Sequence, residues 1–549
     1  MNNLRLFLFL FLNISLIGGF ANTRGSMNAA TSCVDICQMR YTIPVLVLKD
    51  TNPVLKIGIK TTSEKRIENI SLNLNGTTNL NDIAEITIYE GSKEGIIALS
   101  KKLASTSKIK KTTIIPLEMS MEGKDSLCLW VSLRLKDCVN LSHRFNLNCH
   151  KIKIDGKFYS VPKKYTNGLR VGVALNGRNK EGIHTLRIPG LISLGNEQLI
   201  AVYDARYDSS RDLQGNIDIC CQRSTDGGKT WGKIQKVLDM GTYGNLPEKY
   251  NGVSDAAILY DNYTGKVWVA ATWMHGVLDK NTGKWIENLI EDSTVWNHQW
   301  ASYGSQPGWG IRQSSQIILS NSIDQGKTWS KPINITSQVK RPQDWLQTVA
   351  PGNGIVLTNG TIVFPAQGRT ETGMPFSNLM YSKDGGNTWK ASKPAGINTT
   401  ECTVVQRNDG SIMLNMRDNR NYRDYSEHNG RKICVTNDIG ETWKEHPTSH
   451  HALIEPVCMA SLYRHVYDHK KKAVLLFSNP DNKLTRTHIT LKVSFDEGET
   501  WSSKKILLDE LSGLGYSCIT SVDENRIGIL YEGSQHNLVF QIVNLKELL

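Results

Sequence analysis

Residues 224–231 read STDGGKTW, and this eight-residue pattern occurs five times in the chain. Successive copies begin 98, 60, 54 and 58 residues apart. A repeat of about 50 to 60 residues with strand-like sequence between its copies is typical of the blades of a β-propeller. We therefore expect residues 166–549 to form one all-β propeller domain. The other copies are Ser322–Trp329 (SIDQGKTW), Ser382–Trp389 (SKDGGNTW), Thr436–Trp443 (TNDIGETW) and Ser494–Trp501 (SFDEGETW).

Each position of the repeated pattern has a structural explanation. The Asp in the third position can accept hydrogen bonds from the backbone of a turn, and the Gly in the fifth position supplies a positive φ. The Thr and Trp that follow begin the next strand, and the Trp offers an aromatic face for packing between blades. We expect these five Asp residues to stabilise turns and not to act in catalysis.

The region before the repeats has a different pattern. Short stretches that alternate between apolar and polar residues, each bounded by turn residues, occur between about residue 40 and residue 158. Period-two alternation without a helical period predicts half-buried strands, and six or more of them predict a β-sandwich. We expect this module to span residues 22–160. Its role stays open between carbohydrate binding and a spacer.

Composition limits the class of protein. The chain has 549 residues, 39% of them apolar and 21% charged, with a mean hydropathy of -0.33. These values exclude a collagenous, disordered or polytopic membrane protein. The first 160 residues hold 21 Lys and Arg against 13 Asp and Glu, so they carry +8 of the net charge of +12. No nucleic-acid-binding motif accompanies this charge, and we expect no nucleic-acid partner.

The N-terminus has the features of an export signal. Arg5 precedes an apolar stretch from Leu6 to Phe20, and Gly19 and Ala21 are small residues suited to a cleavage site. We expect a signal peptide at residues 1–21 and a periplasmic, cell-surface or secreted protein without a membrane span after cleavage. Eleven cysteines are an odd number, so a monomer keeps at least one free thiol. Their spacing forms no metal motif, and we expect no metal and no cofactor.

The interval between the first two repeats is about 40 residues longer than the others and is rich in Trp. Six of the thirteen Trp residues lie there, whereas five lie in the repeats. This segment is either an extended hairpin that packs on the propeller or one wall of a ligand pocket, since aromatic walls suit sugars and acyl groups. The six are Trp268, Trp273, Trp285, Trp296, Trp300 and Trp309.

Charged residues that lie between the repeats form a second group. They fall in different expected blades, and such residues can converge at the central channel of a propeller. The sequence Arg187-Ile188-Pro189 precedes the first repeat, and the residues that follow it in order are Arg206, Asp212, Asp255, Glu401, Arg417, Arg486, Tyr516 and Glu532. With these residues the chain from about 166 to 549 resembles bacterial exo-α-sialidases (neuraminidases), whose six-bladed propellers carry Asp boxes and an Arg-Ile-Pro motif.

The resemblance implies three arginines around a substrate carboxylate. The matching positions are Arg187, Arg417 in Asn415-Met416-Arg417, and Arg486. Guanidinium groups bind a carboxylate bidentately and stay charged at any working pH, so they suit sialic acid. Glu532 matches the carboxylate that orients the first arginine.

The resemblance also assigns the catalytic groups. Tyr516 matches the nucleophile, Glu401 the base that activates it, and Asp212 the general acid and base. A phenol with a pKa near 10 needs such a base, because it is mostly neutral at pH 7.

The resemblance also implies contacts around the sugar. Arg206 and Asp255 match residues that contact the O4 side of the sugar, and Trp273 or Met274 are the candidates for the N-acetyl pocket. The region before residue 160 is similar to the N-terminal β-modules of some of these enzymes.

The resulting hypothesis is a retaining exo-α-sialidase that releases terminal sialic acids from glycoproteins, gangliosides and sialyl-oligosaccharides through a covalent glycosyl-tyrosine. One alternative is a trans-sialidase, including an intramolecular one that forms an anhydro sugar. Another is a non-catalytic propeller that binds sialic acid, which would lack at least one of Tyr516, Glu401 and Asp212. We expect a monomer.

Overall fold

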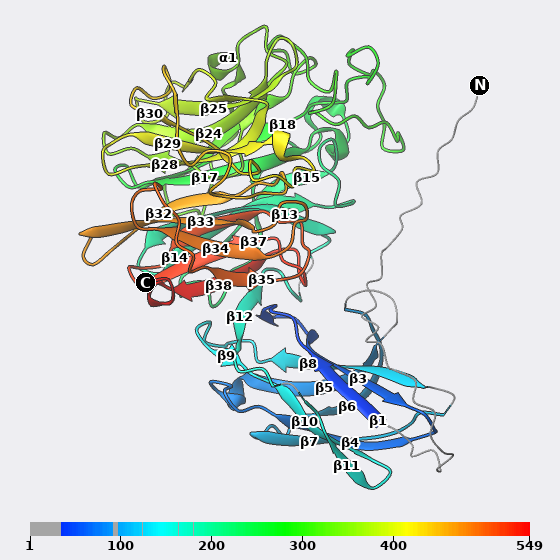
Figure 1. Cartoon of the computed structure of the whole chain (residues 1–549). Helices are drawn as coiled ribbons and strands as arrows, with labels where there is room; N and C mark the ends of the chain where they lie inside the picture. The colour runs from blue at the N-terminus through cyan, green and yellow to red at the C-terminus, as the bar shows by residue number, and fades with distance from the viewer. Residues whose placement is uncertain (1–33, 92–96, 123–124, 163, 179–180) are drawn as a thin grey trace.

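The computed structural model describes residues 34–91, 97–122, 125–162, 164–178 and 181–549, so the expected signal peptide lies outside the described residues. Figure 1 shows two all-β bodies, with the N-terminal one in blue and cyan below a larger one that runs from green to red. None of the helices within the described ranges has the length and apolar character needed to cross a membrane. They are α1 (Thr336–Val339) and the 3-10 helices η1 (Leu80–Asp82), η2 (Tyr243–Asn245), η3 (Glu248–Tyr250), η4 (Asn419–Asn421) and η5 (Leu545–Glu547).

The N-terminal body is a sandwich of two antiparallel sheets. Its core is made of the buried apolar residues that alternate along the strands, as the period-two pattern predicted. Strand β7 shows this alternation directly, since buried and exposed residues follow one another along its first half. One sheet has the order β1 (Val34–Met39), β3 (Asn52–Thr61), β8 (Ser126–Leu135), β5 (Ile83–Gly91), β6 (Leu99–Thr106), and the other β11 (Lys157–Ser160), β10 (Asn148–Ile154), β4 (Arg66–Asn73), β7 (Thr112–Ser120).

The C-terminal body is a propeller, and within the described residues six sheets form its blades. The first blade consists of β13 (Thr185–Gly195), β14 (Gln198–Arg206), β15 (Ile217–Ser224) and β16 (Gln235–Leu238), and the second of β17 (Val253–Asp261), β18 (Lys266–Trp273), β19 (Gln316–Ser322) and β20 (Ile333–Asn334) with β22 (Gly352–Asn353). The third blade consists of β21 (Leu346–Val349), β24 (Ile362–Arg369), β25 (Pro375–Ser382) and β26 (Lys390–Ala391) with β23 (Ile355–Val356) and β27 (Gly396–Ile397). The fourth blade consists of β28 (Thr399–Gln406), β29 (Ile412–Asp418), β30 (Lys432–Thr436) and β31 (Lys444–Glu445).

The remaining two blades complete the ring. The fifth is β32 (Ser461–Tyr467), β33 (Lys472–Pro480), β34 (Ile489–Ser494), β35 (Ile506–Asp509), and the sixth is β36 (Ser517–Ser521), β37 (Arg526–Tyr531), β38 (Val539–Asn544), β12 (Leu169–Ala174), β2 (Val45–Val47), with β9 (Arg144–Phe145) on β12. Strand β12 pairs antiparallel with β38, so the start and the end of the propeller sequence share one sheet.

The closing blade contains a strand that the sequence did not predict. Strand β2 lies between β1 and β3 in the chain, yet it leaves the sandwich and pairs parallel to β12. All three of its side chains are buried. The fully buried side chain of Asn52 stabilises the turn by which the chain goes from β2 back into the sandwich. It accepts a hydrogen bond from the Leu46 amide (2.8 Å) and donates to the carbonyls of Leu46 and Leu133 (both 3.1 Å). The two bodies are therefore joined by shared sheet structure.

The repeated pattern forms the turns for which its residues are suited. In the first copy, Ser224 Oγ donates to Asp226 Oδ1 at 2.8 Å, and the Thr230 amide and hydroxyl donate to the same carboxylate at 3.0 and 2.6 Å. Gly228 has a φ of +88°, and the fifth-position glycines of the other copies also have positive φ. Trp231 packs edge to face on Phe540 of the closing blade, with ring centroids 5.3 Å apart. The prediction of a structural role for the pattern agrees with this geometry, but the Thr and Trp precede the next strand and do not begin it, since β16 begins at Gln235.

Candidate active site

Three breaks in strand register turn side chains towards the propeller axis. The innermost strands β13, β17 and β28 each lose register with their neighbour, next to Arg187, Asp255 and Glu401 respectively. Ile188 and Asp255 have φ values of +60° and +61° at two of these breaks. A β-bulge bends its strand and redirects a side chain, so three blades present polar groups at the same end of the central channel.

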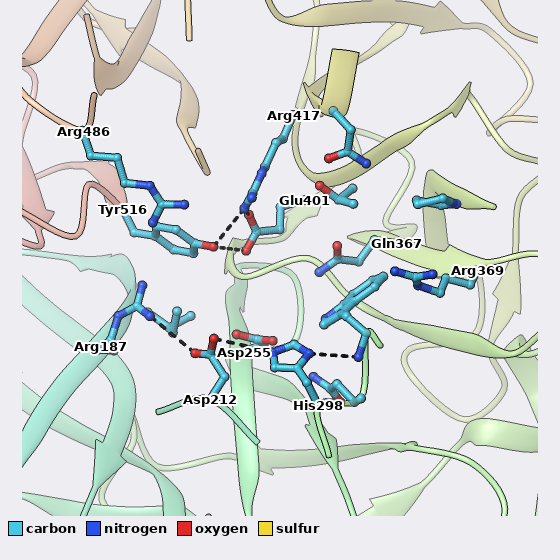
Figure 2. A pocket seen from close by; sticks show the side chains of 16 residues that line it. Arg187, Asp212, Asp255, His298, Gln367, Arg369, Glu401, Arg417, Arg486 and Tyr516 are labelled. Carbon is cyan, nitrogen blue, oxygen red and sulfur yellow. Dashed lines mark hydrogen bonds and ion pairs between the residues drawn. The ribbon is translucent and has the colours of Figure 1, made fainter. Parts of the chain in front are cut away.

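These groups line a pocket of about 360 Å³ (Figure 2). In this view Tyr516 lies at the left with Arg486 and Arg187. Arg417 and Glu401 lie at the top centre, Asp212 and His298 at the lower edge, and Gln367 and Arg369 at the right. The lining residues are Arg187, Ile188, Asp212, Asp255, His298, Gln299, Trp300, Gln367, Arg369, Pro375, Thr400, Glu401, Arg417, Asn419, Arg486 and Tyr516.

Tyr516 and Glu401 form the centre of the pocket. The Tyr516 hydroxyl donates to Glu401 Oε1, while Arg417 Nη1 donates to Glu401 Oε2 at 2.6 Å and to the phenol oxygen at 3.3 Å. Arg187 and Arg486 place their guanidinium carbons 5.2 and 5.6 Å from the Tyr516 ring centroid. Burial and the neighbouring Glu401 raise the pKa of Tyr516 well above its usual value, whereas the arginines oppose this shift. Tyr516 is therefore a neutral phenol that faces a carboxylate.

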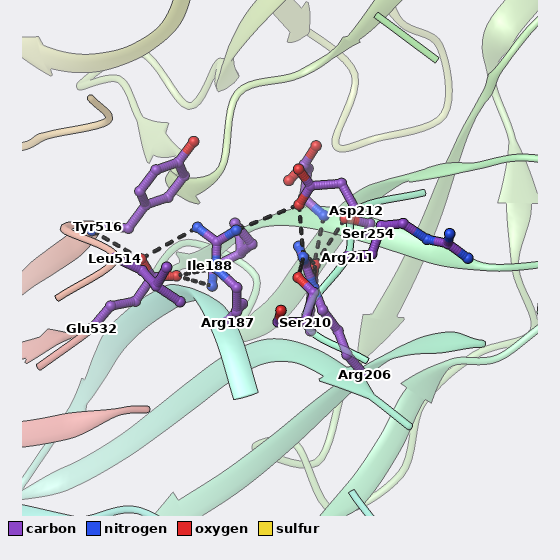
Figure 3. A network of polar contacts seen from close by, with 12 residues as sticks. Arg187, Ile188, Arg206, Ser210, Arg211, Asp212, Ser254, Leu514, Tyr516 and Glu532 are labelled. Carbon is purple, nitrogen blue, oxygen red and sulfur yellow. Dashed lines mark hydrogen bonds and ion pairs between the residues drawn. The ribbon is translucent and has the colours of Figure 1, made fainter. Parts of the chain in front are cut away.

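Glu532 holds both the first arginine and the backbone of Tyr516 (Figure 3). Its Oε1 accepts from Arg187 Nε at 2.9 Å and from the Ile188 amide at 3.0 Å, and its Oε2 accepts from the Tyr516 amide at 3.1 Å. The Glu532 side chain is only 1% exposed. One buried carboxylate thus holds both Arg187 and the backbone of Tyr516, because both bond to its two oxygens.

Asp212 lies across the pocket from Tyr516, on the loop between β14 and β15, and its side chain is 46% exposed. Its Oδ1 accepts from Arg206 Nη1 at 2.6 Å and from Arg187 Nη1 at 3.4 Å, and its Oδ2 lies 3.6 Å from His298 Nε2. Although partial burial opposes ionisation, the contact with His298 and the charges of Arg206 and Arg187 hold the pKa of Asp212 well below its usual range. The free site therefore contains an ionised Asp212.

The inserted segment sets the tautomer of His298. The Trp300 amide donates to His298 Nδ1 at 3.0 Å, so a neutral His298 carries its proton on Nε2, which faces Asp212. Trp300 also lines the pocket. The Trp-rich segment between the first two repeats is thus part of the pocket wall, one of the two possibilities that the sequence left open.

Arg206 and Asp255 occupy different positions relative to the pocket. Asp255 lines it, and burial together with the negative charges of Asp204, Glu401 and Asp212 raises its pKa well above the usual range. Arg206 is fully buried and does not line the pocket. It bonds to Asp204 at 2.8 Å and to Asp212, so the structure corrects the expectation that it contacts the sugar and makes it a support for Asp212.

The expected N-acetyl pocket also needs correction. Trp273 and Met274 are 3% and 4% exposed and do not line the cavity. Trp273 ends β18 and packs between blades, and Met274 contacts Leu213 and Ile217 beneath the Asp212 loop. Both are core residues because β18 ends at Trp273, so the inserted segment has not yet extended away from the blade at these two positions.

The sequence did not single out several residues on the far wall. They carry no motif, and only the Trp enrichment of the inserted segment gave a signal for Trp300. Gln367 lines the pocket although it is only 1% exposed, and its buried Oε1 has no hydrogen-bond partner. The lining residues missed are His298, Gln299, Gln367, Arg369, Pro375, Thr400 and Asn419.

The third arginine of the predicted triad is held by backbone groups. Arg486 Nη1 donates to the Leu514 carbonyl at 2.9 Å and Nη2 to the Val457 carbonyl at 3.4 Å. Three guanidinium groups thus surround Tyr516, a set suited to a planar anion. Within the described residues no three His, Cys, Asp or Glu side chains are grouped as metal ligands, and every cysteine there is a free thiol.

Comparison with known proteins gives matches to both bodies. A family model described as the N-terminal domain of BNR-repeat neuraminidase matches residues 34–158, and a BNR repeat-like domain model matches residues 188–532. A sialidase of Bacteroides fragilis is 37% identical over 537 residues, which cover 92% of this chain and 94% of that protein.

Solved structures are also similar. The Hadza microbial sialidase Hz136 matches with a TM-score of 0.83 and 32% identity, covering 93% of this chain and all of that one. The intramolecular trans-sialidase of Ruminococcus gnavus has a TM-score of 0.50 at 20% identity over 67% of this chain, a likeness of fold alone.

Proposed function

Because the chain belongs to the BNR-repeat neuraminidase family and is a sialidase, we propose that it is a retaining exo-α-sialidase that works through a covalent glycosyl-tyrosine. The observation that carries this proposal is the Tyr516 hydroxyl, which donates to Glu401 while guanidinium groups surround it. Terminal sialic acids on glycoproteins, gangliosides and oligosaccharides are the proposed substrates.

In this proposal Arg187, Arg417 and Arg486 bind the substrate carboxylate. Their convergence around Tyr516 supports the assignment, since a carboxylate or a carbonyl holds each guanidinium in place. The carboxylate would lie beside the carbon that carries the glycosidic oxygen. This carbon would then face the Tyr516 hydroxyl.

The first chemical step forms the bond between Tyr516 and the sugar. The phenol oxygen attacks the anomeric carbon and its proton passes to Glu401, while protonated Asp212 gives its proton to the departing glycosidic oxygen. In the second step Asp212 takes a proton from water, the water oxygen attacks the anomeric carbon, and Tyr516 leaves and regains its proton from Glu401. The configuration is retained because each step inverts it.

Asp212 is ionised in the free site, so substrate binding has to raise its pKa. The geometry supports such a coupling, because Arg187 contacts both Asp212 and the proposed carboxylate position. A substrate carboxylate on Arg187 would weaken the Arg187–Asp212 contact and add negative charge nearby. Both effects favour the protonated acid.

Trapping with 2,3-difluorosialic acid tests the nucleophile. The fluorine at C3 destabilises the charged transition states, so a glycosyl-enzyme should accumulate and be visible by mass spectrometry. We expect the added mass on the peptide that contains Tyr516. A modified Glu401 or Asp212, or no adduct during complete inactivation, would contradict the assignment.

Products in ¹⁸O-labelled water separate hydrolysis from transfer. Hydrolysis places ¹⁸O in the released sugar, whereas intramolecular transfer gives an unlabelled anhydro sugar. We expect labelled product. We also propose export of the protein and a monomeric state, which cell fractionation and light scattering test.

A further inference from the structure

A buried ion pair lies outside the pocket between the fourth and fifth blades. Arg431 Nη1 and Glu455 Oε2 are 2.7 Å apart, and both side chains are fully buried. Burying two charges costs free energy that their attraction often only offsets, so a pair of this kind is weak evidence of stabilisation and calls for another role. Its hydrogen bonds indicate what that role is.

Glu455 holds the backbone directly after Arg417. Its Oε1 accepts from the Asp418 amide and from Asn421 Nδ2, both at 2.7 Å. The Glu455 amide in turn donates to Asn429 Oδ1 at 3.0 Å. The C-terminal end of β29, which contains Arg417, is therefore held by the charged side chain of Glu455 as well as by the hydrogen bonds of the sheet.

Arg431 holds the same strand on the other side of Arg417 and reaches a second segment. Its Nε donates to Asn415 Oδ1 at 2.7 Å, and its Nη1 donates to the Cys458 carbonyl at 2.7 Å. The preceding carbonyl, that of Val457, accepts the hydrogen bond from Arg486. The pair thus touches the backbone next to Arg417 and the backbone that anchors Arg486, which lie on either side of Tyr516 in Figure 2.

We propose that Arg431 and Glu455 are positioning residues that set the spacing of Arg417 and Arg486 for the substrate carboxylate. The inference rests on the proposed function, in which these arginines bind that carboxylate. Arg187 needs no such device, because Glu532 contacts its guanidinium directly. Arg417 does need one, because the groups that bond to its guanidinium, Glu401 and Tyr516, are themselves part of the pocket. Its Nε is buried without a hydrogen-bond partner, so the position of its strand determines where the guanidinium lies.

The test compares two inhibitors that differ only in charge at one position. Dehydrated sialic acid (2-deoxy-2,3-didehydro) carries the carboxylate, and its methyl ester does not. The ratio of their inhibition constants measures how well the arginines recognise the carboxylate. Glu455→Gln keeps the size of the side chain but loses its charge. Arg431→Lys keeps the positive charge but loses the guanidinium group that bonds to two partners at once. It gives a second measurement of the acid-to-ester ratio if Glu455→Gln folds poorly.

We expect both variants to lower the preference for the acid over the ester by about tenfold or more, because one charge-assisted hydrogen bond has about that value. KM should rise more than kcat falls. Glu547→Gln is the matched control, since Glu547 pairs with Arg170 at 2.9 Å in the closing blade, away from the pocket. It should destabilise the fold and leave the preference unchanged.

The outcomes separate the two proposals. A wild-type protein that binds acid and ester equally would overturn the carboxylate role of the arginines, and with it the proposed function. A wild-type preference that persists in Glu455→Gln and Arg431→Lys would overturn the positioning role alone. A purely structural role predicts lower stability with an unchanged preference, and that result also counts against the positioning role.

Discussion

Replacing Glu532 by Gln tests how a single buried carboxylate supports the site. The side chain accepts from Arg187, Ile188 and Tyr516 through both of its oxygens. A Gln amide keeps one acceptor and turns an N–H group towards donors that previously had a partner. Removing one partner of a buried ion pair costs about 3 to 5 kcal/mol, so the free energy of unfolding should fall by that amount.

The same substitution should weaken the reaction. Loss of one charge-assisted hydrogen bond to Arg187 costs about 1.5 to 3 kcal/mol, which lowers kcat/KM by roughly 10- to 100-fold. The measurements are urea unfolding and hydrolysis of a methylumbelliferyl sialoside, with Arg187→Ala in parallel. Arg187→Ala should cost more, because it removes the group that contacts substrate. If Glu532→Gln lowers stability but leaves kcat/KM unchanged, the orienting role is wrong.

Three further predictions concern the nucleophile, the acid and the turns. Tyr516→Phe should lower kcat by roughly 1,000-fold or more while the affinity for dehydrated sialic acid changes little; near-normal turnover would exclude Tyr516 as the nucleophile. The pKa of Asp212 is lower in the folded protein than in the unfolded chain, so its carboxylate stabilises the fold above about pH 4 and this stabilisation is lost as the pH falls. The difference in unfolding free energy between wild type and Asp212→Asn should therefore be largest near neutral pH and shrink below about pH 4, and a constant difference would contradict the shift. Gly228→Ala should cost about 2 to 4 kcal/mol in thermal or urea unfolding, since φ is +88° and the new Cβ would overlap the Phe540 ring. Gly385→Ala, where φ is +68° and the space is open, should cost clearly less, and equal losses would show that the ring contact is unimportant.

The propeller could be predicted because its repeated turns are local. Asp226 and Gly228 act on atoms within four residues, so their spacing in the sequence reports their geometry directly. The N-terminal sandwich was predictable for a similar reason, since alternation along a strand reflects burial on one face. Strand β2 was not, because three apolar residues between two strands do not reveal which sheet they join.

The site could be predicted only where the family motif supplied the residue. Tyr516, Glu401 and the three arginines lie in the pocket, yet composition and spacing alone gave no reason to group them. Trp273 was chosen for its place in a Trp-rich segment, whereas burial between blades determines its role. Residues of the far wall, such as Gln367 and Trp300, lie in loops and at strand ends. Their distance from Tyr516 depends on how whole blades are arranged, which the local sequence does not show.

The composition of the closing blade affects how the chain can fold. Its sheet needs residues 45–47, 169–174 and 517–544 together, and the pairing of Gly172 with Gln541 joins residues 541 − 172 = 369 positions apart. Such high contact order makes ring closure a late and slow event, because the entropy of closing the loop is lost before the contacts form. During synthesis the other five blades can form as local hairpins while the sixth waits for its last strand. Truncation after β36 would remove β37 and β38 and open the ring, whereas loss of β2 would expose the edge of β12 without opening it.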